Sequence, residues 1–241
     1  MTTSVRGFKE AGGRWIYAAV AVAIGVVVFL GFAESYFLRP FVTHADSLSI
    51  LVHMHGALMT AWIALFIAQT SLVAIGRRDL HRRLGTLGMA LLALILVVSV
   101  PMIIVAAKLG GHHMPGPALP ALALVLAFLC EFIGLACLGL FYRDRSDLHK
   151  RLMLMATITA MEAGVIRLPL AVLDHSVLKA HVVTDALLLT IIAIDGIRHR
   201  RLHPVFIWGA LFLVAMQGFS MWISNTSMWL RVAQGILEAS G

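Results

Sequence analysis

The stretch DLHRRL at residues 79–84 returns as DLHKRL at residues 147–152, each time between two long apolar runs. A looser version, RHRRLHP at residues 198–204, follows the next pair of apolar runs. A basic turn that carries histidine at the same point of successive helical hairpins is typical of a polytopic membrane protein. The repeated phrase therefore predicts an all-α integral membrane protein built from helical hairpins.

The composition agrees with a lipid environment. Of the 241 residues, 60% are hydrophobic and 13% are charged, and the mean hydropathy is +0.92, whereas a soluble domain carries about 25% charged residues. About seven segments approach the length that crosses a bilayer. They lie at residues 15–37, 48–75, 84–107, 119–142, 151–173, 178–197 and 205–224. We predict one transmembrane domain: a first helix, three hairpins (48–107, 119–173 and 178–224) and a tail at 225–241.

The positive charges lie unevenly on the two sides of this predicted bundle. Of the 19 Lys and Arg residues, 14 precede the first segment or follow the second, fourth and sixth. The 14 are Arg6, Lys9 and Arg14; Arg77, Arg78, Arg82 and Arg83; Arg143, Arg145, Lys150 and Arg151; and Arg198, Arg200 and Arg201. By the positive-inside rule, this asymmetry predicts a cytoplasmic N-terminus and a periplasmic C-terminus in a bacterial inner membrane.

Single residues predict where several helices begin or end. Asp79 and Asp147 are placed to cap the helices that follow the repeated phrase.

A loop rich in glycine and proline surrounds His112 and His113. This exposed pair could bind a metal, but exposed histidine pairs usually have no role. The tail at 225–241 is either an interfacial helix on the outer surface or a loose end.

Ionisable side chains inside the apolar segments fall into layers, and such groups usually face the interior of a bundle. The outer layer holds His53, His55, Arg167, His181 and Asp185, from three segments. The inner layer holds His81 and His149, at matching positions of the repeated phrase, with Asp195 nearby. Glu131 and Glu162 form a polar core near mid-membrane, where they are either neutral buried acids or part of a proton path.

Two histidine layers suit the axial ligation of haem iron by neutral imidazole. We predict His55 and His181 as outer ligands, because His53 points away from His55 around the helix. His81 and His149 are the predicted inner pair. Arg167 would contact a propionate or form an ion pair with Asp185, and Asp185 would tune His181.

A short resemblance favours the same cofactor. The segment HGALMTAW at residues 55–62 resembles the opening of a core helix in transmembrane di-haem b-type cytochromes of the ascorbate- and ferric-reductase-like group, and HRRLG at 81–85 is similar to their helix starts. The resemblance implies haem b, electron transfer as the oxidoreductase activity, a quinone or a periplasmic redox partner, and Gly56 as room for the macrocycle. His81 and His149 depart from the pattern, since they stand at the rim. The whole chain also resembles a broad group of bacterial polytopic membrane proteins, which implies an architecture but no activity.

Simpler interpretations and other functions stay open. The rim histidines suit contacts to lipid headgroups, His55 suits a buried hydrogen bond, and Arg167 with Asp185 suits a structural ion pair. A transporter-like or accessory protein would use the polar core as an ion or substrate path. A metal-dependent membrane enzyme is a third candidate, although the last segment holds no histidine. The lipid bilayer is the predicted partner; nucleic acid is not, because topology explains the net charge of +7.

Overall fold

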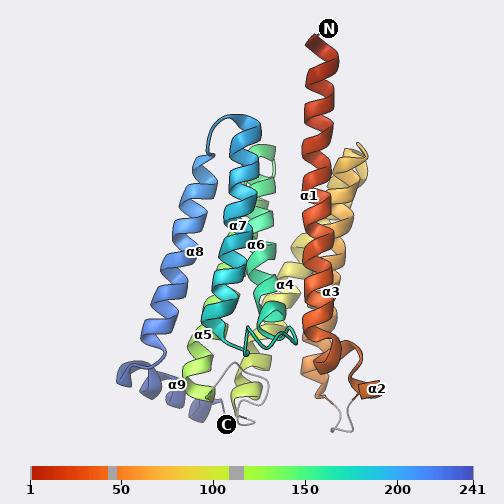
Figure 1. Ribbon diagram of the computed structural model, residues 1–241. Helices are drawn as coiled ribbons and strands as arrows, with labels where there is room; N and C mark the ends of the chain where they lie inside the picture. The colour runs from red at the N-terminus through yellow and green to blue at the C-terminus, as the bar shows by residue number, and fades with distance from the viewer. Residues whose placement is uncertain (1, 43–47, 109–116, 241) are drawn as a thin grey trace.

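A computed structural model describes residues 2–42, 48–108 and 117–240, with side chains from residue 13 onward. All of the regular structure in these ranges is helical, as predicted (Figure 1). The elements are α1 (Thr2–Phe32), the π-helix η1 (Ala33–Phe37), α2 (Arg39–Val42), α3 (Ile50–Ala74), α4 (Arg78–Lys108), α5 (Ala118–Phe141), α6 (Ser146–Ile166), α7 (Val177–His199), α8 (Pro204–Ile223) and α9 (Ser227–Ala239).

Six of these helices, rather than the predicted seven, are long and apolar enough to cross a membrane. They are the stretch Gly13–Phe37, then α3, α4, α5, α7 and α8. The remaining predicted segment corresponds to α6, which is more polar because it carries Asp147, Lys150, Arg151 and Glu162. The outward faces of the other helices are apolar, with side chains such as Val97 exposed, and suit contact with lipid.

The three hairpin turns, at 75–77, 142–145 and 200–203, lie together at one end of the bundle (Figure 1). We call this the basic end, because these turns and the helix ends beside them hold the repeated basic phrases. The short helix α9 lies at the opposite end, which we call the α9 end, and the two chain ends lie at opposite ends of the bundle. The clustering of the basic turns predicted from the charge pattern is thus present in the fold.

Helix boundaries differ from the predicted ones where side-chain chemistry was misjudged. Asp79 and Asp147 do not cap; each lies inside the first turn of its helix, where its charge still complements the helix dipole. Asp79 instead binds Arg77 at the surface. The fifth predicted segment, 151–173, is a helix only to Ile166, because Pro169 disfavours helical geometry in the residue before it.

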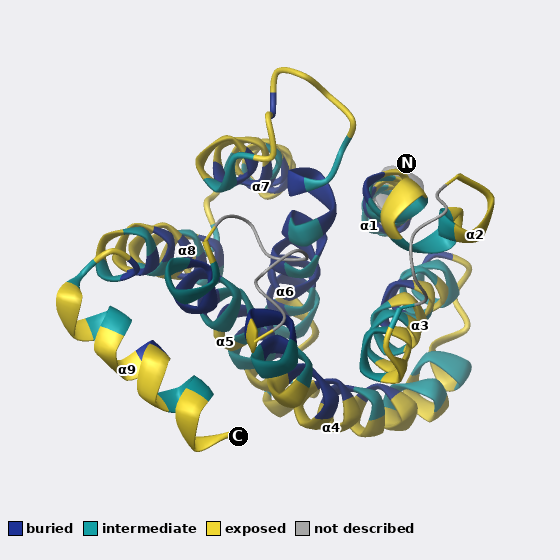
Figure 2. Ribbon diagram, turned by 90° about the horizontal axis from the view of Figure 1, so that it is seen from below, coloured by how far each residue is buried: buried dark blue, intermediate teal, exposed yellow. Residues whose placement is uncertain are grey.

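The helix α6 occupies the middle of the bundle, although it is the least apolar of the long helices. Seen along the bundle axis, it lies inside the ring of other helices (Figure 2), and it contacts α1, α5, α7 and α8. Thirteen of its 21 residues are buried. The surrounding apolar helices bury Arg151 and Glu162 of α6, whereas Asp147 at its start stays exposed.

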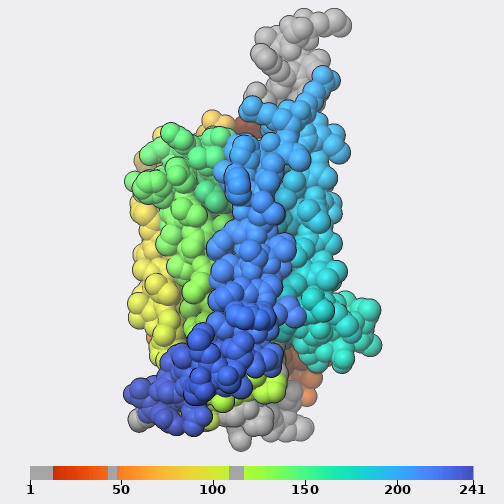
Figure 3. All heavy atoms as spheres, turned by 90° about the vertical axis from the view of Figure 1, so that its left-hand side faces the viewer, coloured from red at the N-terminus to blue at the C-terminus, as the bar shows by residue number. Residues whose placement is uncertain are grey.

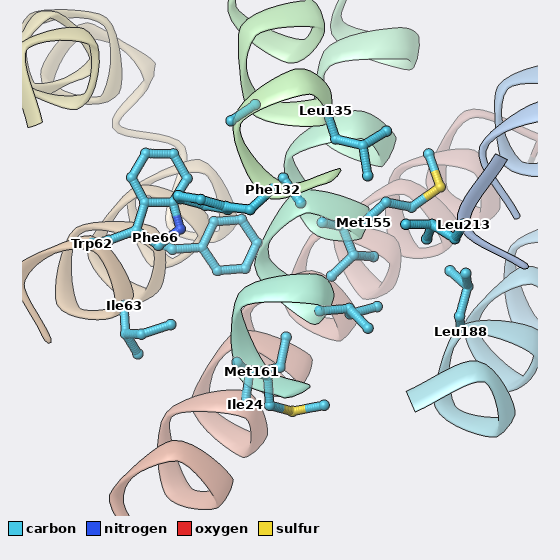
Figure 4. Close-up of a cluster of buried hydrophobic side chains, with 14 of the residues drawn as sticks. Ile24, Trp62, Ile63, Phe66, Phe132, Leu135, Met155, Met161, Leu188 and Leu213 are labelled. Atoms are coloured by element: carbon cyan, nitrogen blue, oxygen red, sulfur yellow. The ribbon is translucent and has the colours of Figure 1, made fainter. Parts of the chain in front are cut away.

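Most of the core is a layer of apolar side chains around the middle of α6. Met155 and Met161 of α6 meet side chains from α1, α3, α5, α7 and α8 (Figure 4). The contributors labelled there are Ile24, Trp62, Ile63, Phe66, Phe132, Leu135, Leu188 and Leu213. Trp62 packs edge-on against Phe132 with 5.0 Å between ring centroids.

The helices α1 and α6 cross in close contact through two glycines. A Cβ atom added to Gly31 would overlap the backbone carbonyl of Gly164, and one added to Gly164 would lie 3.1 Å from the Cα of Val28. Backbone atoms cannot move aside as a side-chain tip can. This contact is the small-residue packing that lets membrane helices approach one another.

We therefore expect Gly31→Ala to lower the free energy of unfolding by about 1–3 kcal/mol, the usual cost of overpacking. Unfolding in mixed micelles of dodecylmaltoside and sodium dodecyl sulfate measures this. Gly134→Ala is the matched control, since a Cβ there meets nothing within 4 Å, and it should be neutral or stabilising. Equal behaviour of the two variants would contradict the close crossing.

The tail forms a helix rather than a loose end. Thr226 caps α9 by accepting a hydrogen bond from the backbone of Trp229. The indole of Trp229 donates to the carbonyl of Leu119 at 2.9 Å, and Ala233 is fully buried against α4 and α5. In the space-filling view α9 lies across the lower end of the bundle (Figure 3).

Candidate functional site

Buried charged groups form two separate layers, both centred on α6 and α7. Towards the α9 end, the Glu162 carboxylate of α6 pairs with Nδ1 of His181 on α7. Both side chains are almost fully buried, and Phe128 of α5 packs edge-on against the imidazole with 5.7 Å between centroids. The sequence placed both residues inside the bundle but did not predict their pairing.

Glu131 of α5 extends this layer. It is 1% exposed, and neither of its carboxyl oxygens has a hydrogen-bond partner among the described residues. It lies within electrostatic range of Glu162 and Asp185. Asp185 in turn accepts a hydrogen bond of 3.2 Å from Gln217 of α8. Three acidic groups and one imidazole, from α5, α6 and α7, thus share one apolar region.

The second layer, near the basic end, is a buried ion pair that was not predicted from the sequence. Arg151 donates through Nε and Nη2 to Oδ2 of Asp195 at 3.1 and 2.6 Å, and through Nη1 to the carbonyl of Asp147 at 2.7 Å. Arg151 and Asp195 are 3% and 5% exposed. Tyr17 and His199 approach the other carboxylate oxygen, each at 3.4 Å.

The signal for this pair was available in the sequence. Asp195 interrupts an apolar run one turn before its end, and a lone acid there requires a cation. The charge pattern grouped Arg151 with the other basic residues of its turn, as it grouped Arg83 at the matching position of the first phrase. The structure leaves Arg83 at the surface. Only the packing of α7 on α6 distinguishes the two arginines.

Apolar side chains separate the two layers. Arg151 and Glu162 are eleven residues apart on α6, which corresponds to about 16 Å along a helix. Between them lie Met155, Leu188 and Leu213, which pack together from α6, α7 and α8 (Figure 4). This apolar contact lies between the two charged layers.

The predicted outer histidine pair is not brought together by a shared partner. His55 is part-buried and its Nδ1 lies 3.0 Å from the Ser99 hydroxyl on α4, whereas His181 binds Glu162. The space beside Gly56 is filled by the ring of Tyr36, where the resemblance implies a macrocycle. His53 is exposed, and its ring lies 5.8 Å from that of Tyr36.

Arg167 and Asp185, predicted to pair, have other partners. Arg167 caps the end of α6, donates to the carbonyl of Ala163 at 2.8 Å and lies over the ring of Phe32 at 4.9 Å. A cation over an aromatic face is stabilised most where water is excluded. This aromatic partner of Arg167 comes from α1.

The predicted inner histidines do come together. The rings of His81 and His149 are nearly perpendicular, with 6.1 Å between their centroids. Nδ1 of His149 lies 2.7 Å from the carbonyl of Gly139, which fixes the ring and leaves its Nε2 for another partner. The histidines at 112 and 113 lie outside the described residues.

Comparison of the chain with known protein families, curated proteins and solved structures finds no match. Among the described residues, no group of three or more His, Cys, Asp and Glu side chains is arranged to hold a metal ion. The two buried charge layers and the His81–His149 pair are the chemically distinctive features of the described residues.

Proposed function

We propose that the protein carries protons through the membrane, and that Glu131, Glu162 and His181 are the groups that bind and pass the proton. The main support for this proposal is that the Glu131 carboxyl is fully buried and has no hydrogen-bond partner among the described residues. An unpaired carboxylate in apolar surroundings costs several kcal/mol, and protonation removes most of that cost. Ionisable groups inside membrane bundles commonly mark ion pathways and proton relays.

The neighbouring pair supplies an acceptor for this proton. The Glu162 carboxylate and the His181 imidazole can share one proton between oxygen and Nδ1, because they are in contact. Transfer from Glu131 to this pair moves a proton from α5 to the α6–α7 interface. The Arg151–Asp195 pair is the matching charged group on the other side of the apolar layer. Passage between the layers requires water to enter around Met155 and Leu188.

The same proposal includes the topology. At about 1.5 Å per residue, the 21 residues of α6 span about 31 Å, close to the thickness of a bilayer core. We take α6 as the seventh crossing, enclosed by the six apolar helices. The basic end then faces the cytoplasm of a bacterial inner membrane and the C-terminus faces the periplasm, which the positive-inside rule supports.

Proton flux into vesicles tests the function directly. The purified chain is reconstituted with a pH-sensitive dye inside, and a potassium gradient with valinomycin sets the voltage. We expect flux well above that of empty vesicles, and Glu162→Gln should reduce it by at least roughly tenfold because the amide cannot ionise. Glu238→Gln, an exposed change on α9, is the control. Wild-type flux equal to that of empty vesicles would refute the proposal.

A second candidate, electron transfer through haem b, is favoured by the His81–His149 pair. The two imidazoles come from α4 and α6 and lie with 6.1 Å between their ring centroids, so together they would hold the iron if haem were bound. The hydrogen bond from His149 to Gly139 is the kind that orients a ligand imidazole. Haem would supply a one-electron carrier, and the two histidines would hold it.

Absorption spectra of the purified protein, as isolated and after dithionite, test this candidate. A haem protein should give a Soret band and α and β bands that sharpen on reduction. His81→Ala and His149→Ala should each remove these bands. The variants His55→Ala and His181→Ala test the predicted outer ligands by the same measurement. His175→Ala, at the opposite end of the bundle, is the control. A colourless protein from haem-replete cells would exclude haem.

A further inference from the structure

A small cavity opens at the basic end, between the start of α6, the end of α7 and the start of α8. Its volume is about 110 Å³, and it is lined by Asp147, Lys150, Arg151, His199, Arg201 and His203. The second copy of the repeated phrase thus contributes three of the lining residues. Arg151 of the Arg151–Asp195 pair lines the cavity, but none of the proposed proton-binding groups Glu131, Glu162 and His181 does.

The charges that line this cavity are not balanced within the described part of the protein. Arg151 is neutralised by Asp195, and Asp147 lies 3.4 Å from Nε2 of His203. Lys150 contacts the ring of Tyr17 at 5.3 Å but forms no salt bridge with a described carboxylate, and the same holds for Arg201. With Lys150, Arg151 and Arg201 as three cations and Asp147 and Asp195 as two anions, the groups around the cavity carry one net positive charge when the histidines are neutral.

Size and chemistry limit what this space can hold. A volume of about 110 Å³ is several times the space that one water molecule needs. The cavity therefore has room for a tetrahedral oxyanion. Arginine and lysine together are the usual recognition set for phosphate oxygens. Basic pockets between helices at a membrane surface bind lipid headgroups through the same chemistry.

We propose that the cavity lined by Lys150, Arg151 and Arg201 binds a phosphate group, the chemistry shared by an anionic phospholipid headgroup and free inorganic phosphate. Lys150 and Arg201 contact the phosphate oxygens. Arg151 stays paired with Asp195, and its positive charge attracts the anion at longer range. The bound anion joins the start of α6 to the α7–α8 turn. It thereby holds the third hairpin against the central helix at the basic end.

Native mass spectrometry and thermal unfolding of the full chain in detergent test this site. The probes are dioleoylphosphatidylglycerol, dioleoylglycerol, which has the same acyl chains but no phosphate, and inorganic phosphate. We expect phosphatidylglycerol to bind and to raise the Tm, and the double variant Lys150→Gln/Arg201→Gln to bind it at least roughly tenfold more weakly. Lys150→Arg/Arg201→Lys keeps both positive charges and should retain binding. Comparison of the two double variants therefore distinguishes a loss of charge from a loss of folding.

The repeated phrase offers a matched control. Arg82 holds the position of Lys150 in the first copy, at the same end of the bundle, but it is exposed and lines no part of this cavity. Arg82→Gln should leave the affinity unchanged. Stabilisation by inorganic phosphate alone would identify free phosphate as the ligand, and stabilisation by the phospholipid alone would identify the headgroup. Equal loss of affinity in Arg82→Gln and in the double variant would overturn the site, as would equal binding of dioleoylglycerol.

Discussion

Replacing Asp195 by asparagine should lower the free energy of unfolding by about 3–5 kcal/mol, because it leaves the Arg151 guanidinium buried without its counter-charge. The two side chains are 3% and 5% exposed and are joined by two hydrogen bonds to one oxygen. A guanidinium that is only 3% exposed is poorly solvated once its counter-charge is lost. Unfolding in mixed detergent micelles measures the loss.

A double-mutant cycle separates the pair from each residue alone. Arg151→Gln/Asp195→Asn removes both charges and should recover much of the stability lost in Asp195→Asn, since amide groups can still bond to one another. Asp79→Asn is the control: its partner Arg77 is more than half exposed, as is Asp79 itself, and surface pairs contribute little. An Asp195→Asn protein as stable as wild type would contradict the buried ion pair.

Replacing Glu131 by methionine should act in opposite directions on stability and on proton flux. Methionine has a similar shape and removes a buried polar group without a partner, so we expect a gain of about 1–3 kcal/mol in the free energy of unfolding. The same change removes a proton-binding group, so proton flux should fall by at least roughly tenfold. Groups kept at a cost to stability are typical of functional sites.

The two measurements distinguish a structural from a functional carboxyl. A protein that gains stability and keeps its flux would mean that Glu131 takes no part in proton transfer. A protein that loses stability would mean that the carboxyl has a structural partner. Glu238→Met, at an exposed position of α9, should change neither quantity.

Much of the architecture follows from the sequence because lipid imposes simple rules. A backbone in hydrocarbon must satisfy its own hydrogen bonds, so long apolar runs become helices. The basic phrase at residues 79–84 and its copies fix the turns, since arginine and lysine stay out of the bilayer. The helix ends were predicted less accurately than the helices themselves. Asp79 and Asp147 lie inside the first turns and interact with the helix dipole through their charge, instead of capping the helices.

The candidate site was predictable only in part. Apolar context sufficed to place Glu131, Glu162 and His181 inside the bundle, because an ionisable group in a membrane helix avoids lipid. Their partners depend on which faces of α5, α6 and α7 meet. From its composition, α6 also resembled the other predicted spanning segments. Its buried charges Arg151 and Glu162 are kept from lipid by the helices packed around α6.

The sequence by itself therefore determines the helices, their hairpin order and the end at which the basic turns gather. These are local properties, set by hydropathy and charge along the chain. The tertiary structure alone decides that Arg151 binds Asp195 while the equivalent Arg83 stays at the surface, that Tyr36 fills the space beside Gly56, and that Glu131 has no hydrogen-bond partner among the described residues. Each of these depends on the rotation and crossing of helices, which small side chains such as Gly31 and Gly164 set and which no single segment encodes.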